Sequence, residues 1–308
     1  MPVIKQLPPI ATGFTVSSEL VHKRDESEVL LTSWDSYRPD TFVVCAQWPV
    51  QHRFYQSRNG LHDPMLFAES VRQCFPLLSH AGYDVPFGHH LIWQYLNFEI
   101  VPSAMDIGTD PTEVELYITC SDIRRRGGQL AALTLHVIAL RDGKHLGVAQ
   151  ARFTCHTPSV YRRLRGRYAG ATALPGALPA AEAPHLVARE QEEDVVLSPT
   201  EQHGTWLLRN DTSHPVLFDH PLDHSPGMLM LEAARQATHA HAYAEHAYPV
   251  KFESTFLQFA EFDAPCQVTV EELPTRDRTQ RRTEILATQN GEMAFSSLVT
   301  ALVGPPLP

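Results

Sequence analysis

The sequence predicts an α+β fold that occurs twice in one chain, each copy with one long helix packed against an antiparallel sheet. Three observations lead to this prediction. Two stretches of the chain repeat the same order of elements: a strand, a long helix, then three or four strands. Both helices contain Glu-x-x-Arg-Gln, and a segment rich in alanine, proline and glycine separates the stretches. Such repetition indicates an internal pseudo-dimer.

Length and composition agree with two globular domains. The chain has 308 residues, of which 43% are hydrophobic and 19% charged, so it can bury a sizeable core. A net charge of -10 disfavours nucleic acid and anionic membranes as partners. No apolar run approaches the roughly 20 residues that span a bilayer, and the first residues do not resemble a secretion signal. Five dispersed cysteines are typical of reduced thiols, so we expect a cytoplasmic protein.

The first half, residues 1–165, is expected to form the N-terminal domain. Phe42–Trp48 is typical of a short buried strand, and the apolar spacing in Pro64–His80 predicts a helix. Proline inside a helix costs about 3 kcal/mol, so Pro76 predicts a kink or an early end near Cys74. Alternating apolar and polar residues predict three antiparallel strands: Val114–Cys120, Leu130–Leu140 and Gly147–His156.

The second half begins after a predicted linker at residues 166–185 and forms the C-terminal domain, residues 186–308. A short apolar segment, Val216–Phe218, precedes a turn rich in histidine, proline and aspartate, and a helical pattern then runs from Pro226 to about His246. Four strands are expected after it: Phe252–Phe262, Cys266–Leu273, Arg282–Gln289 and Ala294–Val303.

The repeated Glu-x-x-Arg-Gln is the main candidate for a site. It reads Glu69, Arg72 and Gln73 in the first helix and Glu232, Arg235 and Gln236 in the second, and spacing i,i+3 puts each glutamate and arginine on one helix face. Apolar neighbours make both helices core helices, where a carboxylate is unfavourable unless it is paired. An ion pair that only fixes helix packing is the alternative interpretation. Because the motif stands at matching positions in both helices, a functional site and a purely structural ion pair are about equally favoured.

The start of the second helix, Pro226-Gly227, adds a possible binding feature. Proline preorganises the first turn, and glycine lets a ligand approach free N–H groups that could polarise a thioester carbonyl. An ordinary helix start is the alternative. The first helix has Pro64-Met65 at this place and lacks the glycine, so we expect the two sites to differ.

The run Pro226–Ala237 resembles the central helix of hot-dog-fold hydroxyacyl-carrier-protein dehydratases. The whole chain, from about residue 21 to 300, more closely resembles the AfsA family of A-factor (γ-butyrolactone) biosynthesis proteins, which are double hot dogs. Seven stretches carry this resemblance: Val21–Lys23, Glu28–Thr32, Ala46–Pro49, His52–Tyr55, the Glu69 helix with Leu77–His80, Val85–His89 and Asp219–His224.

The resemblance implies a tandem hot-dog fold and an acyltransferase. Such enzymes move a β-ketoacyl chain from an acyl-carrier-protein thioester to the hydroxyl of dihydroxyacetone phosphate, and the ester then condenses to a butenolide phosphate on the way to a γ-butyrolactone-type signal. The implied partners are therefore the β-ketoacyl carrier protein and dihydroxyacetone phosphate, with no cofactor. A hot-dog dehydratase or thioesterase, or a non-catalytic acyl-binding module, remain alternatives.

The resemblance also implies roles for residues. The family's active-site glutamates and arginine match Glu69, Glu232 and Arg235, the expected catalytic residues. We hypothesise that Glu232 takes the proton of the attacking hydroxyl, that Arg235 holds the phosphate or the oxyanion, and that the Gly227 amide binds the thioester oxygen. The expected substrate-binding residues are Gly227, Arg72, Gln236, Gln73, His220 and His52.

The sequence disfavours two further alternatives, a dehydratase and a metal-binding protein. A dehydratase is disfavoured because the turn from His220 to Glu232 is about two residues shorter than the dehydratase pattern and because Arg235 takes a position that is usually small or apolar. The histidines lack a usual metal-ligand spacing, so we expect no metal site. Two arginine clusters, at 124–126 and 162–167, could dock an acidic carrier protein, although solvated surface is the more common explanation.

Overall fold

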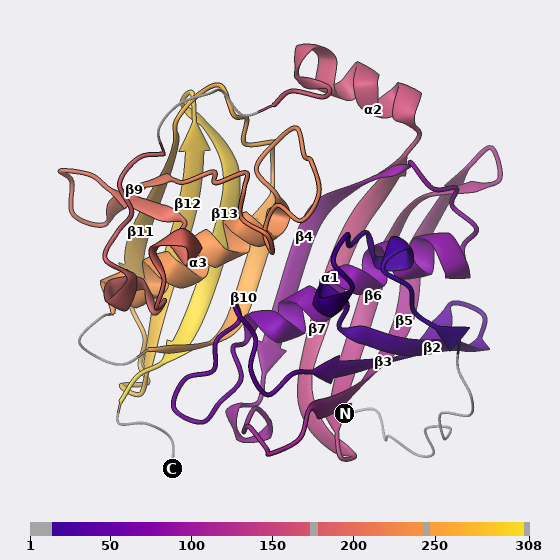
Figure 1. Cartoon of the computed structure of the whole chain (residues 1–308), viewed down its shortest axis with the longest axis horizontal. Coiled ribbons are helices and arrows are strands. Elements are labelled where there is room, and N and C mark those ends of the chain that lie inside the picture. Colours follow the sequence, from indigo (N-terminus) through magenta and orange to yellow (C-terminus); the bar gives the residue numbers. More distant parts are fainter. Residues whose placement is uncertain (1–13, 173–177, 243–246, 305–308) are drawn as a thin grey trace.

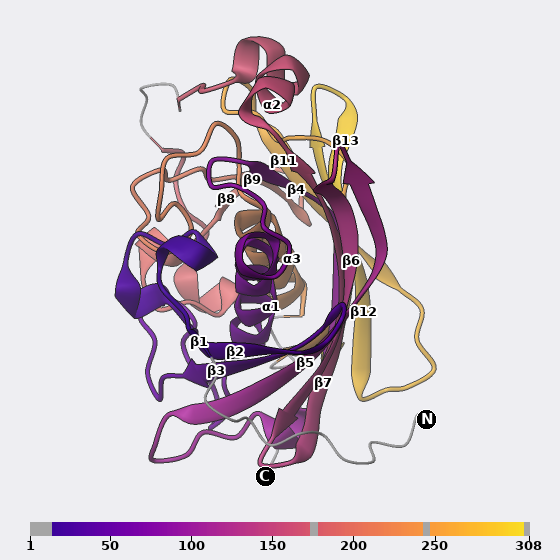
Figure 2. The same cartoon turned by 90° about the vertical axis from the view of Figure 1, so that its right-hand side faces the viewer.

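One antiparallel sheet of 13 strands runs through both halves of the chain and curves around two helices (Figures 1 and 2). The computed structural model describes residues 14–172, 178–242 and 247–304. The helices are α1 (Met65–Leu77), α2 (Pro158–Arg165) and α3 (Gly227–His241). The first-half strands are β1 (Phe14–Thr15), β2 (Leu31–Arg38), β3 (Thr41–Trp48), β4 (His90–Ile100), β5 (Thr112–Arg126), β6 (Gln129–Arg141) and β7 (Lys144–His156). The second-half strands are β8 (Leu197–Pro199), β9 (Thr205–Leu208), β10 (Tyr248–Phe256), β11 (Cys266–Leu273), β12 (Gln280–Gln289) and β13 (Glu292–Leu302).

The order of strands shows the internal duplication. It is β1-β2-β3-β5-β6-β7-β4-β10-β13-β12-β11-β9-β8, so the order β3-β5-β6-β7-β4 is mirrored by β9-β11-β12-β13-β10 across the junction. β4 and β10 pair with each other from Lys251 opposite Glu99 to Thr255 opposite Tyr95. At this junction the buried rings of Phe98 and Phe252 stack with centroids 4.7 Å apart. The predicted pseudo-dimer is therefore one continuous sheet.

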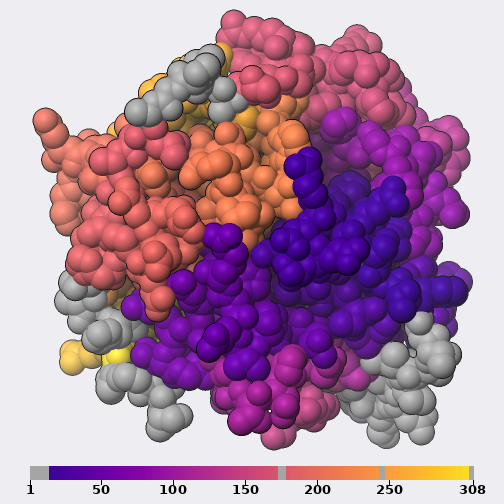
Figure 3. Space-filling model, viewed as in Figure 1, coloured from indigo at the N-terminus to yellow at the C-terminus, as the bar shows by residue number. Residues whose placement is uncertain are grey.

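Both central helices lie side by side on the concave face of the sheet and are buried nearly all round (Figure 2). Every residue of α1 except Arg72 is buried, which confirms the prediction of a core helix. Loops of the two halves close over the helices. The backbone N–H of Arg24 donates to Asp219 Oδ2 at 2.7 Å, and Figure 3 shows the indigo N-terminal surface meeting the orange surface of the second half.

The predicted tandem α+β architecture is confirmed, with three differences in detail. The structure has strands that the sequence pattern does not reveal, β1, β2 and β4 in the first half and β8 and β9 in the second, where Val216–Phe218 forms a turn instead of a strand. The first helix does not end near Cys74 but runs through Pro76 to Leu77 and continues as a π-helix over Leu78–Gly82. Burial of the apolar side chains around Pro76 outweighs the helix-breaking effect of the proline. α3 ends at His241, and residues 243–246 of the predicted helix lie outside the described residues.

The domain boundaries stay a prediction. Within the predicted linker, Gly166–Tyr168 forms a 3-10 turn that directly follows α2, and residues 173–177 lie outside the described residues. All five cysteines are free and four of them are buried, as in the predicted reduced protein.

Truncating the ring at the sheet junction should destabilise the whole fold. Phe252→Ala removes a side chain that is 0% exposed, and we expect the free energy of unfolding to fall by about 3–5 kcal/mol. Chemical denaturation followed by circular dichroism measures this change. Tyr37→Ala, at a ring that is 54% exposed, serves as the control and should change it by less than about 0.5 kcal/mol. Equal effects of the two substitutions would contradict the proposed importance of the junction.

Candidate active site

A buried carboxylate surrounded by donors lies in the middle of each central helix. In α1 this is Glu69, which accepts hydrogen bonds from Arg72 (Nη2–Oε1 2.9 Å and Nε–Oε2 3.1 Å) and from Gln73 (Nε2–Oε1 2.9 Å). The Nζ of Lys23 lies 3.1 Å from Glu69 Oε1. Two cations therefore hold one carboxylate that is only 2% exposed.

The second helix repeats the arrangement around Glu232. Arg235 donates to it through Nε and Nη2, both at 2.8 Å, and Gln236 Nε2 donates at 2.6 Å. The place of Lys23 is taken by Arg189, whose Nε and Nη2 lie 2.9 and 2.8 Å from the carboxylate oxygens. Glu232 is 0% exposed.

The chain builds the two clusters in the same way. A short 3-10 helix precedes each cation and is followed by a left-handed residue, His22 (φ 53°) before Lys23 and Ala188 (φ 56°) before Arg189. Lys23 and Arg189 are site residues that the helix motif does not reveal. The shared sequence Val-x-cation near the start of each half is the signal that points to them.

The two glutamines bind the helices to neighbouring backbone. Gln73 donates to Glu28 O and accepts from Leu30 N, at 2.8 and 2.9 Å. Gln236 forms the equivalent pair with Asp194 O and Val196 N, also at 2.8 and 2.9 Å. These contacts fix the segment that precedes β2 or β8 against the helix.

The two clusters differ in net charge. In the C-terminal cluster Asp63 adds a second carboxylate, with Oδ2 3.2 Å from Arg189 Nη1, so two cations face two carboxylates. Asp63 stands just before Pro64, and the residue just before Pro226 is Ser225. The N-terminal cluster thus has Lys23 and Arg72 against Glu69 alone and keeps one positive charge.

Both central carboxylates are weak bases. Burial by itself would raise the pKa of Glu69, but the charges of Arg72 and Lys23 outweigh burial and lower this pKa from 4.5 to about 2. The pKa of Glu232 is likewise lowered, because Arg189 and Arg235 outweigh its burial. Each carboxylate therefore stays ionised at neutral pH and serves as a fixed anion that orients its cations.

Only the N-terminal cluster faces a large cavity of about 1120 Å³ that lies between the two halves of the chain. Glu69, Arg72 and Lys23 line it, whereas Glu232 and Arg235 do not. Of the other predicted site residues, Gly227 and His220 line the cavity and Gln73, Gln236 and His52 do not. The start of α3 therefore lines the same cavity as the Glu69 cluster of α1, whereas the Glu232 cluster of α3 does not line it.

One part of the cavity wall is apolar. Six of its lining side chains form this apolar wall: Phe75, Trp93, Met228, Met230, Phe256 and Phe295. Gly227 is required by the wall itself, because a Cβ there would lie 2.7 Å from Cε3 of Trp93. Its predicted role in binding a thioester oxygen stays a prediction.

The predicted histidines have different surroundings. His220 lies in the loop before α3, its side chain is 43% exposed, and burial of part of the ring together with Arg72 lowers its pKa. His52 holds a turn: its Nδ1 accepts from the amides of Phe54 and Tyr55, each at 3.1 Å, and its Nε2 lies 3.4 Å from Glu28 Oε2. His214 forms the same turn contacts in the second half, which favours a structural role for His52.

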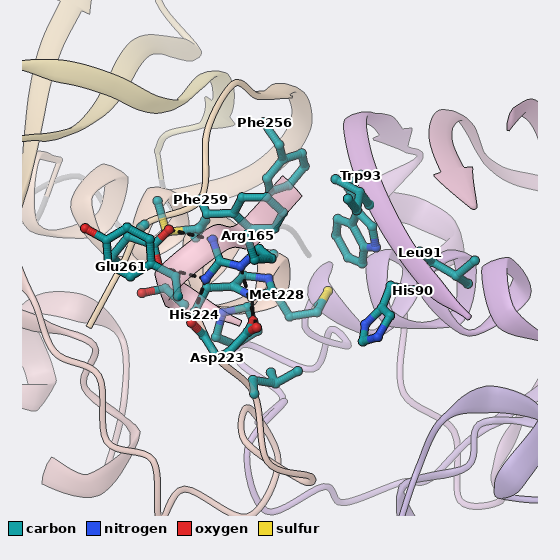
Figure 4. Close-up of a pocket in the computed structure, with 18 of the residues that line it drawn as sticks. His90, Leu91, Trp93, Arg165, Asp223, His224, Met228, Phe256, Phe259 and Glu261 are labelled. Atoms are coloured by element: carbon teal, nitrogen blue, oxygen red, sulfur yellow. Dashed lines mark hydrogen bonds and ion pairs between the residues drawn. The ribbon is translucent and has the colours of Figure 1, made fainter. Parts of the chain in front are cut away.

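A second polar group lies in the same cavity, beside α2 (Figure 4). The carboxylate of Asp223 is 2.7 Å from Nδ1 of His224 and accepts from the hydroxyl of Tyr161 at 2.6 Å. Arg165 forms an ion pair with Glu261, with Nη2–Oε2 2.7 Å. Figure 4 shows Arg165, Asp223, His224 and Glu261 apart from His90, Leu91 and Trp93, while the ring of Tyr161 stacks on His90 with centroids 3.6 Å apart. This group is not part of the predicted site.

In the part of the chain that the structure describes, no three histidine, cysteine, aspartate or glutamate side chains are arranged to hold a metal ion. Over the same residues no helix is long and apolar enough to cross a membrane.

Comparison with known proteins identifies the family. The profile of the A-factor biosynthesis hotdog domain, AfsA, matches residues 7–157 and 172–303. The chain belongs to the AfsA family. It is 41% identical over 285 residues to a 2-oxo-3-(phosphooxy)propyl 3-oxoalkanoate synthase of Streptomyces virginiae, covering 92% of this chain and 97% of that protein. The synthase of the same name from Streptomyces coelicolor is 39% identical over 300 residues, which cover 96% of this chain and 93% of that protein. The family predicted from the sequence is therefore confirmed.

Solved structures confirm the tandem hot-dog fold. A putative oleoyl thioesterase from Lactobacillus plantarum superposes with a TM-score of 0.55 at 11% identity, covering 86% of this chain and 97% of that one. An acyl-ACP thioesterase from Bacteroides thetaiotaomicron gives a TM-score of 0.51 at 13% identity, covering 84% and 97%. At such low identity these likenesses concern the AfsA chain's fold alone.

The buried C-terminal cluster should make stability depend on pH. Glu232→Gln leaves Arg189 and Arg235 without their carboxylate, and we expect about 3–5 kcal/mol lower stability at pH 7. The folded pKa of Glu232 lies below its unfolded value, so its contribution is complete above about pH 5 and is lost as the pH falls toward 2. The difference between wild type and variant should therefore shrink over that range.

Urea denaturation at several pH values measures this difference. Glu201→Gln, at an exposed carboxylate, provides the control and should show no such trend. A difference between wild type and Glu232→Gln that stays constant from pH 7 to pH 3 would contradict the assignment.

Proposed function

We propose that this AfsA protein transfers a 3-oxoacyl chain from a thioester to the hydroxyl of dihydroxyacetone phosphate, which would form the ester that its Streptomyces relatives are named for, a 2-oxo-3-(phosphooxy)propyl 3-oxoalkanoate. The resulting ester then condenses to a butenolide phosphate. The observation that carries the proposal is a single cavity that joins an apolar wall to a buried cluster with one excess positive charge. A fatty chain fits the first part and a phosphate fits the second.

The phosphate of the acceptor is assigned to Lys23 and Arg72. Both line the cavity, and their charges exceed that of Glu69 by one. Arginine donates to phosphate oxygens in a fork, and lysine supplies a compact charge beside it. Glu69 keeps the two cations in place. It is thus proposed as a positioning residue rather than the catalytic residue that the family resemblance implies.

We assign the phosphate-holding role predicted for Arg235 to Lys23 and Arg72 of the other half, and we give Glu232 no direct contact with the substrate. Their cluster is electrically balanced, fully enclosed and absent from the cavity lining. Its function here is to fix α3, so that Gly227 and Met228 at the start of this helix can shape the cavity.

We further propose an acyl carrier protein as the thioester donor. Arg162 and Leu164 of α2 line the cavity, and Leu164 is 58% exposed. Arg162 and its exposed neighbour Arg163 form no ion pair within the described parts of the chain, although the protein has a net charge of -10. α2 is itself anchored by the contact of Arg165 with Glu261. An exposed leucine that follows two exposed arginines, on a helix that lines the cavity, fits an acidic protein that delivers a tethered chain.

The proposed reaction can be followed by mass spectrometry. Purified protein is incubated with a 3-oxoacyl carrier protein, with and without dihydroxyacetone phosphate. The expected product is the phosphorylated ester, or the butenolide phosphate formed from it by loss of water, only when the acceptor is present. Free 3-oxo acid formed regardless of acceptor would identify a thioesterase and overturn the proposal, as would an unchanged thioester across a series of chain lengths.

The Lys23–Arg72 cluster should determine the affinity of the enzyme for dihydroxyacetone phosphate. Lys23→Met removes one of the two phosphate-binding charges, so we expect KM for dihydroxyacetone phosphate to rise at least about 10-fold, as expected for the loss of a charged hydrogen bond. The KM for the acyl thioester should change little. Arg24→Met removes the exposed neighbouring charge and is the control. An unchanged KM for the acceptor in Lys23→Met would place the phosphate elsewhere.

Arg162 and Arg163 should affect the reaction only when the acyl chain is carried by the carrier protein. The double variant Arg162→Glu, Arg163→Glu should lower kcat/KM for a carrier-protein thioester by about 10-fold or more, since charge reversal slows association. Turnover of the same acyl chain on free pantetheine should be retained. Arg124→Glu, Arg126→Glu at the end of β5 is the matched control. Equal losses with both donors would show that the arginines serve the cavity and not docking.

A further inference from the structure

We propose that His224, held by Asp223, is the base that takes the proton from the acceptor hydroxyl during acyl transfer. This inference rests on the proposed function and adds to it the residue that performs the proton transfer. It is carried by the geometry of the polar group beside α2 (Figure 4).

The first observation is the orientation of the imidazole. Nδ1 of His224 lies 2.7 Å from Oδ1 of Asp223, which places the ring proton on Nδ1 and leaves the lone pair on Nε2. Nε2 has no hydrogen-bond partner within the described residues, and His224 lines the cavity with its side chain 22% exposed. The ring edge also packs against Phe259, with centroids 4.7 Å apart. A fixed imidazole with one free nitrogen is the arrangement that a general base needs.

The second observation is how firmly Asp223 is held. Its Oδ1 accepts from the hydroxyl of Tyr161 at 2.6 Å, and its Oδ2 accepts from the amide of Gly170 at 3.1 Å. Nε of Arg165 lies 3.5 Å from the same Oδ2. These donors outweigh burial and lower the pKa of Asp223, so it remains an anion. An ionised, immobile carboxylate can orient His224 and stabilise the imidazolium that forms.

The third observation comes from the duplicated half of the same chain. His62 occupies the matching position, two residues before Pro64 as His224 is two residues before Pro226. Nε2 of His62 is occupied by Thr112 Oγ1 at 2.9 Å, and the residue is 2% exposed. The fold therefore needs no free imidazole nitrogen at this position. Of the two matching histidines, only His224, which lines the cavity, has a free imidazole nitrogen.

The remaining candidate bases in the cavity are less suited. Glu69 has a pKa of about 2 and two cations bound to it. The pKa of His22 is lowered to about 3, mainly by burial and then by His80, with which its Nε2 already shares a 2.8 Å contact. His220 has no oriented contact: its nearest carboxylate oxygen, of Asp219, is 3.9 Å away.

The chemical step balances with the residues present. The acceptor hydroxyl oxygen forms a bond to the thioester carbonyl carbon while its proton moves to Nε2 of His224. When the tetrahedral intermediate collapses, the carbon–sulfur bond breaks and the thiolate takes the proton from Nε2. The products are the ester and the carrier thiol, and the imidazole returns to its neutral form.

Kinetics of substituted enzymes test this assignment. His224→Gln should lower kcat by about 100-fold or more, within the usual range for loss of a general base, while KM for dihydroxyacetone phosphate stays within about 3-fold. His224→Ala should recover activity when imidazole is added, which a merely structural role would not allow. His156→Gln is the control, since its Nε2 contacts Thr154 at 2.8 Å outside the cavity lining.

The pH profile supplies a second readout. The charged and titratable groups around His224 are Asp223 in its own loop, Tyr161 and Arg165 of α2, His90 of β4, and Glu261 after β10. If His224 is the base, the acid limb of the kcat/KM profile of the wild-type enzyme should be absent from that of His224→Gln. Asp223→Asn should lower kcat without abolishing thioester binding, which fluorescence titration with a pantetheine thioester measures.

Two results would overturn the assignment. Near wild-type kcat in His224→Gln would exclude His224 as the base, and a larger loss in His220→Gln would move the base to His220. Both results still require transfer by the wild-type enzyme, so they leave the proposed function standing. A wild-type enzyme that makes no ester would instead overturn the proposed function and this inference together.

Discussion

The rest of the structure depends on the burial of one glutamate in the middle of each central helix. A carboxylate removed from water destabilises the fold unless cations and hydrogen-bond donors surround it. The chain supplies them from the helix itself, through arginine and glutamine, and from a left-handed turn far away in the sequence, through Lys23 or Arg189. Each cluster therefore joins the entry segment of its half to the helix, and the sheet then wraps around that unit.

Duplication gives two such clusters with different surroundings. Asp63 neutralises the cluster of the second half and helps to enclose it, whereas the ion pairs of the first-half cluster leave one cation in excess beside the cavity, where we propose that the phosphate binds. The same division applies to the paired histidines, since His62 is enclosed in the core and His224 keeps a free nitrogen. One half of the AfsA chain thus stabilises the fold while the junction of both halves forms the site.

The cavity has its functional groups at different places along its walls. The cationic cluster of α1, the apolar side chains around Trp93 and Met228, and the Asp223–His224 pair beside α2 all contribute to its lining. In the proposed reaction this arrangement separates phosphate binding, chain binding and proton transfer. It also explains why the start of α3 must be glycine, because Trp93 fills the space where a Cβ would stand.

The sequence by itself determined the duplicated α+β architecture, the core helices and most of the strands, because apolar periodicity and repeated motifs are local properties of the chain. The AfsA family followed from the resemblance of seven stretches to known members. It also pointed to Glu69, Arg72, Gly227 and His220, which the structure brings to one cavity. Only the tertiary structure decided that Glu232 and Arg235 are absent from the cavity lining. Their environment depends on Asp63, which lies more than 160 residues away in the chain and reaches their cluster through its ion pair with Arg189.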